Sequence, residues 1–155
     1  MLRISLLELI VRGIFEELFF VLSVHAFSKT GINLKRFLLS GMIFWISQYF
    51  IRCLPIQYGI HSILSLIVLI ILGNLINKID IIKSIRAGII TFILGFIFEG
   101  MNLCFIQFIL KKDLNMVMNN PNLKVLYGIP SVIVLGIFVI AYYLILLKRK
   151  ELKYV

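Results

Sequence analysis

The fold of this chain is decided by residues 6–27, LLELIVRGIFEELFFVLSVHAF. The segment can cross a bilayer as a helix, because about 20 apolar residues span the hydrocarbon core. It nevertheless carries four charged side chains, Glu8, Arg12, Glu16 and Glu17. Each charge near the middle of a membrane helix costs about 2.5–3.5 kcal/mol, whereas an apolar residue returns only about 0.3–0.6 kcal/mol. This helix therefore needs partners, either within this chain or in another one.

The composition of the whole chain indicates a membrane protein. Of its 155 residues, 61% are hydrophobic, and the mean hydropathy is +1.07. Soluble domains are only about 45–50% apolar, and a soluble fold of this size has too little interior to bury the excess. We expect one transmembrane domain, residues 1–155. Its net charge of +9 lies mainly in short loops between apolar segments, which a membrane surface explains better than nucleic acid does.

Five apolar segments predict an all-α, polytopic membrane protein with five transmembrane helices. We place these helices at about residues 6–27, 37–53, 58–75, 87–110 and 125–147. Pro130 is expected in the first turns of the last helix, where proline is tolerated. Four spans, with the first segment lying flat or re-entering, is the alternative.

The distribution of Lys and Arg predicts the orientation of the helices. Ten of these residues lie in the first and third loops and the C-terminal tail, and five lie on the opposite side. The positive-inside rule therefore places the C-terminus in the cytoplasm and the N-terminus outside, in a multi-pass protein of the cell membrane. The basic tail, KRKELKYV, is expected to anchor on anionic lipid or to dock a cytoplasmic partner.

Charged side chains within the first predicted helix form a pattern with helical spacing. Glu8, Arg12 and Glu16 are spaced i, i+4 and i+8, so they share one stripe and Arg12 can pair with either glutamate. Glu17 points about 100° away from Glu16 and must find another partner.

Polar residues of the other helices fall at similar depths. Glu99 is expected near mid-membrane, level with Glu16 and Glu17, and Asn102 shares its face. We predict a cleft that opens to the outside and is lined by a rim and a floor. The rim comprises Glu8, Arg12, Arg52, Tyr58 and His61, and the floor comprises Glu16, Glu17, Glu99 and Asn102.

These charges have two interpretations. They can neutralise one another and fix helix packing or bind a partner's membrane helices, or they can line a ligand or ion site. His61 and His25 are also explained as interfacial polar residues. Cys53 and Cys104 show no zinc-binding spacing and are expected to be small buried hydrophobic residues, so we predict no metal, cofactor or catalytic residue.

The stretch GIFEELFF, residues 13–20, resembles the glutamate pair of the CPBP (CAAX-protease-like) intramembrane family. That family places an arginine one helical turn after the pair, where this chain has Val21, and its later histidine motifs have no recognisable counterpart here. The resemblance implies an intramembrane protease as one alternative.

Three stretches together resemble the membrane-sensor region of clostridial-type GHKL (Agr-like) histidine kinases. They are ELIVRGIFEE at 8–17, VHAFSKTGINLKR at 24–36 and YFIRCLPIQYGIHSIL at 49–64. The chain ends eight residues after its last predicted span, with no kinase region. The resemblance implies a bacterial sensor-like or regulatory module that binds an extracellular ligand or a membrane partner, with a membrane histidine kinase or a second copy as partner. A small transporter or transporter subunit using buried carboxylates is the alternative.

Overall fold

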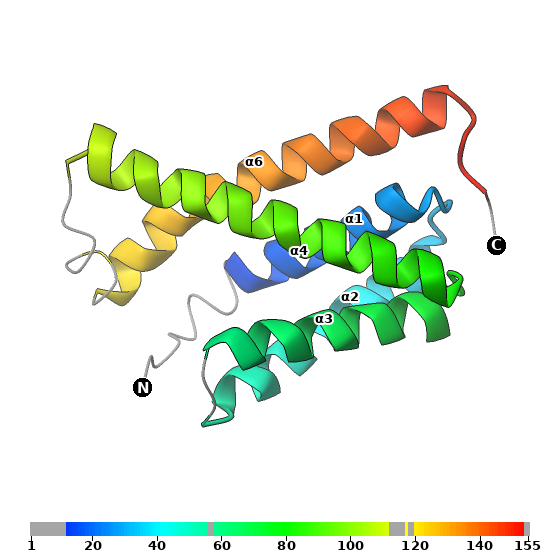
Figure 1. Cartoon of the computed structure of the whole chain (residues 1–155), viewed down its shortest axis with the longest axis horizontal. Helices are drawn as coiled ribbons and strands as arrows, with labels where there is room; N and C mark the ends of the chain where they lie inside the picture. The colour runs from blue at the N-terminus through cyan, green and yellow to red at the C-terminus, as the bar shows by residue number, and fades with distance from the viewer. Residues whose placement is uncertain (1–11, 56–57, 112–116, 118–119, 154–155) are drawn as a thin grey trace.

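The computed structural model describes residues 12–55, 58–111, 117 and 120–153, and within them it is a bundle of long helices (Figure 1). The all-α class and the five helices are confirmed, whereas their insertion in a membrane and their orientation stay predictions. The helices are α1 (Ile14–Ser28), α2 (Leu34–Cys53), α3 (Tyr58–Leu75), α4 (Ile81–Cys104), which continues as the π-helical turn η2 (Phe105–Ile109), and α6 (Pro121–Lys148).

Two helices begin earlier than predicted because polar residues cap them. The Asp80 side chain accepts hydrogen bonds from the backbone N–H groups of Ile82 and Lys83, so α4 begins at residue 81 rather than 87. Asn120 caps α6 in the same way, and Pro121 occupies its first turn. The prediction that Pro130 lies in the first turns was therefore wrong, since it lies inside α6.

Helix α1 is the central element of the bundle and packs against α2, α4 and α6, while α3 packs against α2 and α4. Three consecutive large side chains of α1 each face a glycine of a different neighbouring helix. A Cβ atom built at these glycines would lie 2.6 Å from Leu18, 2.5 Å from Phe19 and 3.1 Å from Phe20. The glycines are Gly41 of α2, Gly136 of α6 and Gly95 of α4, respectively. The missing side chains let each neighbouring helix approach α1 closely.

The apolar core lies in two clusters on either side of α1. Val21 and Val24 of α1 pack with Phe44 of α2 and with residues of α3 and α4. Ala26 of α1 packs with Leu135 and Val139 of α6. Most of the chain's apolar surface is outside these clusters.

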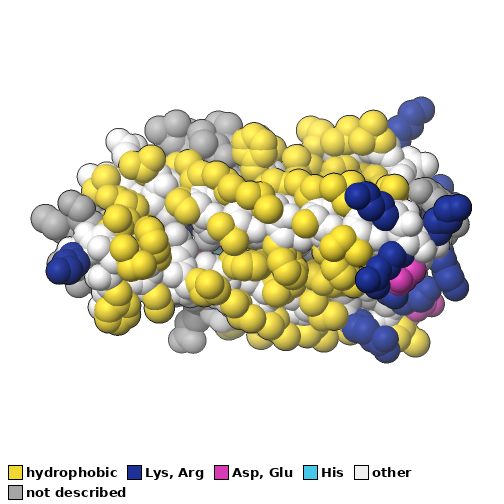
Figure 2. Space-filling view, turned by 90° about the horizontal axis from the view of Figure 1, so that it is seen from above, with side chains coloured by type: hydrophobic (Ala, Val, Ile, Leu, Met, Phe, Trp, Pro, Cys, Tyr) yellow, Lys and Arg dark blue, Asp and Glu magenta, His cyan; other side chains and the backbone are white. Residues whose placement is uncertain are grey.

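The surface of the described bundle is unusually apolar. More of its large hydrophobic side chains are exposed than buried, and Figure 2 shows them covering the middle of the molecule. Two helices, Ile81–Ile109 and Asn122–Lys148, are long and apolar enough to cross a membrane. Only 11% and 33% of their most apolar windows are buried, whereas the core helix of a soluble protein is mostly buried. Lys and Arg side chains gather at the end of the bundle where the C-terminus lies (Figures 1 and 2).

One prediction about burial was wrong. Cys53 and Cys104 are exposed, free thiols rather than buried hydrophobic residues, because both lie on outward-facing sides of their helices. His25 is buried, with 1% of its surface exposed, and its interfacial depth in the membrane stays a prediction. Its Nδ1 atom lies 3.0 Å from the Val21 carbonyl, and its ring meets Phe37 edge-on. Because α1 is central, even the turn near its end is covered by neighbouring helices.

Candidate functional site

Arg12 joins α1 to α4 through two ion pairs. Its Nε atom lies 3.3 Å from Glu16 Oε2, and its Nη2 atom lies 3.1 Å from Glu99 Oε1. The Arg12 side chain is 12% exposed, whereas that of Glu99 is 49% exposed. The guanidinium also rests on α6, because a Cβ atom at Gly128 would lie only 2.7 Å from Nη1. One cation therefore neutralises two carboxylates at a junction of three helices.

Asn102 ties α4 to α6 next to this junction. Its Nδ2 atom donates to the Tyr127 carbonyl oxygen at 2.7 Å. Tyr127 lies in the turn before Pro130, where proline lacks an N–H group and disturbs the helix's own hydrogen bonds. The α6 ribbon changes direction along this part of its length (Figure 1). The Asn102 side chain therefore links α4 to α6 in the turn before Pro130.

Glu17 faces a different side of α1, as its helical angle predicts. The residue is 4% exposed, and its Oε2 atom has no hydrogen-bond partner among the described residues. Its carboxyl group is within electrostatic reach of Arg52 on α2 as well as Arg12 and Glu16. This placement agrees with the prediction that Glu17 points away from the helix stripe that carries Arg12 and Glu16. On that stripe, Arg12 pairs with Glu16 and also with Glu99 of α4.

Gln48 and Ser65 extend the polar region between α2 and α3, although they were not among the predicted site residues. Ser65 Oγ lies 2.8 Å from Gln48 Oε1 and 2.8 Å from the carbonyl oxygen of His61. Gln48 is 5% exposed and Ser65 is 6% exposed. The signal was present in the sequence, because Gln48 and Arg52 are spaced i, i+4 and share one face of α2.

Some predicted site residues fall outside this description. Glu8 lies outside the described residues, and so does the side chain of Tyr58, whose backbone begins α3. The predicted cleft and the roles of its residues stay predictions. Among the described residues, no group of three His, Cys, Asp or Glu side chains could hold a metal ion.

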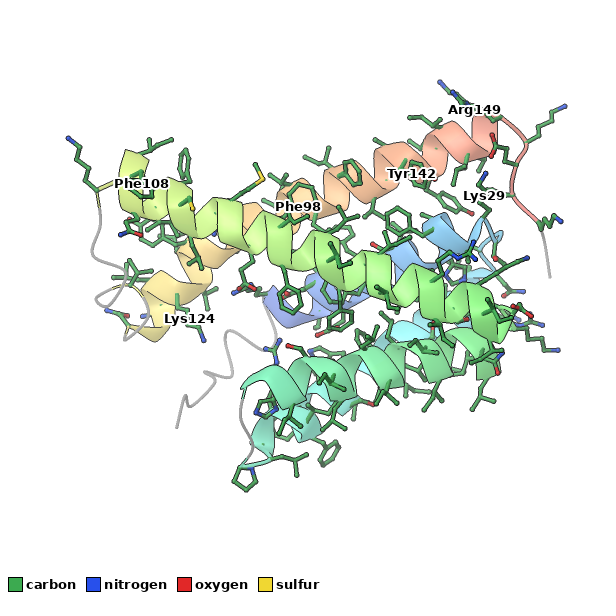
Figure 3. All side chains as sticks on the ribbon, viewed as in Figure 1. Lys29, Phe98, Phe108, Lys124, Tyr142 and Arg149 are labelled. Carbon is green, nitrogen blue, oxygen red and sulfur yellow. The ribbon has the colours of Figure 1, made fainter. Side chains whose placement is uncertain are left out.

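A second set of contacts closes the opposite end of the bundle. The C-terminal segment returns to the turn between α1 and α2, where Gly31 N–H donates to the Lys153 carbonyl at 2.8 Å and Lys153 N–H donates to the Lys29 carbonyl at 2.9 Å. The Lys29 ammonium pairs with Glu151. Figure 3 shows Lys29 at the same end as Tyr142 and Arg149, opposite Phe108 and Lys124. We call these contacts of residues 29–31 with 151–153 the terminal clasp.

The clasp changes the interpretation of the basic tail. The ion pair raises the pKa of Lys29 above its ordinary value, mainly through the hydrogen bond to Glu151, and lowers the pKa of Glu151 through the same contact. Residues 151–153 are thus held by the chain itself, while the neighbouring basic side chains remain at the surface. The lipid anchor and the cytoplasmic partner both stay predictions.

Comparison with known proteins identifies no relative. No protein-family model matches the chain, and neither does any curated protein or solved structure. The resemblances to CPBP proteases and to GHKL-kinase sensor regions therefore stay predictions, and the functional argument depends on the geometry described above.

Proposed function

We propose that this chain is a multi-pass protein of the cell membrane that works as a sensor-like or regulatory module. It binds an extracellular ligand, or the membrane helix of a partner, at the polar cluster around Arg12 and Glu17. Signal transfer occurs by a shift of helix packing and involves no catalytic chemistry of its own.

The distribution of surface chemistry supports the membrane location. Exposed apolar side chains cover the middle of the bundle, and two of the described helices have the length and hydropathy of membrane spans. Basic side chains concentrate at the end that carries the C-terminus (Figure 2). By the positive-inside rule, this end is the cytoplasmic one.

The single observation that carries the ligand-binding proposal is that one guanidinium group, that of Arg12, forms ion pairs with two carboxylates. Arg12 pairs with both Glu16 and Glu99, and its guanidinium lies against Gly128. A ligand that competes for Arg12 or for either carboxylate would weaken the tie between α1 and α4. In this proposal the bundle has two helix packings, one with and one without the tie between α1 and α4. A ligand shifts the balance between them only as far as it binds one more tightly than the other. Helices α4 and α6 carry the change to the cytoplasmic end.

Ligand titration of the purified protein tests this function. We expect an extracellular peptide or metabolite from a broad panel to raise the melting temperature of the wild-type protein in mild detergent. Arg12→Met should lose this response, whereas Arg86→Met, at an exposed position early in α4, should keep it. No shift with any member of the panel, together with no partner on capture from native membranes, would refute the proposal.

A second experiment tests for a protein partner and uses the full chain in its native membrane. Capture in mild detergent followed by mass spectrometry should give a membrane histidine kinase, or a second copy of this chain, at near-equal amount. Replacing Glu99 by Gln should weaken a contact made through the half-exposed carboxylate on α4 and leave contacts elsewhere intact.

A small transporter or transporter subunit is the second candidate, and the buried Glu17 favours it. A carboxylate inside a membrane domain is a common coupling site for a proton or cation. Liposomes containing only this protein should then show proton- or cation-coupled uptake that Glu17→Gln abolishes. Tight liposomes without such uptake would leave the sensor-like module as the better explanation.

A further inference from the structure

Two buried polar groups between α1 and α2 have atoms with no partner among the described residues: Glu17 Oε2 and Gln48 Nε2. Both residues are more than nine-tenths buried. A buried polar group left without a hydrogen bond costs about 1–3 kcal/mol, so two in one region call for an explanation.

Helix packing brings these two residues to the same interface. Leu18 lies on Gly41, and the ring of Phe20 stacks with that of Phe44, so α1 and α2 run side by side in this region. Gln48 lies one turn after Phe44 on the buried face of α2, and Arg52 lies one turn further. Glu17 is within electrostatic reach of Arg52. Gln48 therefore lies on the face of α2 that meets the Glu17 side of α1.

The hydroxyl of Ser65 determines how the Gln48 amide is oriented. Ser65 Oγ has two acceptors at 2.8 Å, Gln48 Oε1 and the His61 carbonyl, but a hydroxyl has only one proton. When that proton goes to the His61 carbonyl one turn earlier, Ser65 Oγ can only accept. The oxygen and nitrogen of an amide are distinguished by their hydrogen bonds. In that case, the Gln48 side-chain amide donates from Nε2 to Ser65 Oγ. Its Oε1 atom then occupies the other position, which has no hydrogen-bond partner.

This orientation places an oxygen acceptor of Gln48 where the structure shows an unpartnered atom, beside the unpartnered Glu17 Oε2 of the described residues. The surrounding charges also favour a bound cation. Among the described residues, the cluster contains three carboxylates but only two guanidinium groups. Two of the carboxylates, those of Glu16 and Glu99, share one arginine. With all three carboxylates ionised, these described residues are one positive charge short.

We propose that Glu17 and Gln48 form a buried site for a monovalent cationic group at the interface of α1 and α2. The group is either a small inorganic cation or the ammonium group of an organic ligand, because both are bound by carboxylate and amide oxygens. This inference names the ligand class of the proposed sensor-like module and rests on that function.

Thermal unfolding of the purified full chain in different salts tests the site. Choline chloride serves as the reference, since its cation is too bulky for a buried site, and sodium, potassium and methylammonium chlorides at equal ionic strength are the probes. We expect at least one probe to raise the melting temperature in a saturable way. A response to sodium or potassium assigns an inorganic cation, and a response to methylammonium alone assigns an ammonium group.

Three variants make the result specific to the site. Glu17→Gln and Gln48→Met should each abolish the shift, whereas Glu151→Gln, which removes a carboxylate of the terminal clasp and not of this cluster, should keep it. If Glu17→Gln does not fold, Gln48→Met still decides the outcome. Identical melting in all four salts, or a shift that persists in both site variants, overturns the inference and leaves a bridging water only. The ligand panel and partner capture described above use none of these salts as probes, so the two proposals fail separately.

Discussion

Arg12 Nη2 lies 3.1 Å from Glu99 Oε1, and this ion pair joins residues that are 87 positions apart in the sequence. Arg12 also pairs with Glu16, so the same guanidinium neutralises one carboxylate within its own segment and one on α4. The pair therefore helps to fix how the central helix of the bundle meets α4.

Loss of Arg12 should destabilise the bundle more than loss of Glu99. Arg12→Met leaves two carboxylates without their cation, and removing one partner of a largely buried ion pair costs about 3–5 kcal/mol. Glu99→Gln removes one half-exposed charge and should cost about 1 kcal/mol or less. Unfolding by titration with sodium dodecyl sulfate measures both, with Arg86→Met as the exposed control. Equal destabilisation by all three variants would contradict the central role of Arg12.

The glycine opposite Phe19 should not tolerate a methyl group. A Cβ atom at Gly136 would lie 2.5 Å from the Phe19 ring, so Gly136→Ala forces either the ring or α6 to move. Overpacking of this kind costs about 1–3 kcal/mol. Gly100→Ala is the matched control, because nothing lies within 4 Å of its Cβ position. The same unfolding titration compares them, and a Gly136→Ala variant as stable as Gly100→Ala would disprove this close packing.

The terminal clasp should loosen at acidic pH. The contact with Lys29 lowers the pKa of Glu151 below its ordinary value of 4.5, so this carboxylate stabilises the clasp above that value. The stabilisation is lost as the pH falls through the lowered, folded-state pKa. The pKa of Lys29 is raised above 10.5, so its contribution is present at neutral pH and is lost only as the pH rises through that higher value.

Nuclear magnetic resonance of the micelle-bound protein measures this loosening. The amide signals of Gly31 and Lys153 report the backbone hydrogen bonds of the clasp. We expect both signals to shift together as the pH falls below 4.5, the ordinary pKa of a glutamate, because the folded-state pKa of Glu151 is lowered. In Glu151→Gln, this titration should disappear. A midpoint above 4.5, or an unchanged titration in Glu151→Gln, would show that another group is responsible.

The two exposed cysteines should differ in reactivity if the apolar surface faces lipid. Cys53 ends α2 next to Arg52, whereas Cys104 ends α4 among exposed apolar side chains. The thiolate is the reactive form and needs water. A membrane-impermeant maleimide should therefore label Cys53 on intact cells, and Cys104 should react only after solubilisation.

Single-cysteine variants, Cys53→Ser and Cys104→Ser, identify which thiol reacts. Labelling of Cys53 only in inverted vesicles would reverse the proposed orientation. Labelling of both thiols at equal rates in intact membranes would argue against a membrane-embedded belt.

The sequence by itself determined the helical elements. The alternation of apolar segments with short polar loops predicted five helices, and the predicted ends of the second and third helices match α2 and α3 closely. The i, i+4 spacing also predicted the pair of Arg12 with Glu16, because neighbours on one helix face are fixed by local geometry. The starts of α4 and α6 were missed, since Asp80 and Asn120 were interpreted as loop residues rather than caps.

Only the tertiary structure decided which helix faces which. The choice of Glu99 as the second partner of Arg12, the burial of His25 and the position of Glu17 opposite α2 all follow from α1 being central. That placement depends on glycines of three other helices meeting Leu18, Phe19 and Phe20. Such close approaches join residues distant in the chain, and no local spacing encodes them. The terminal clasp has the same origin, because Lys29 and Glu151 are 122 residues apart and meet only when α1 and α6 pack together.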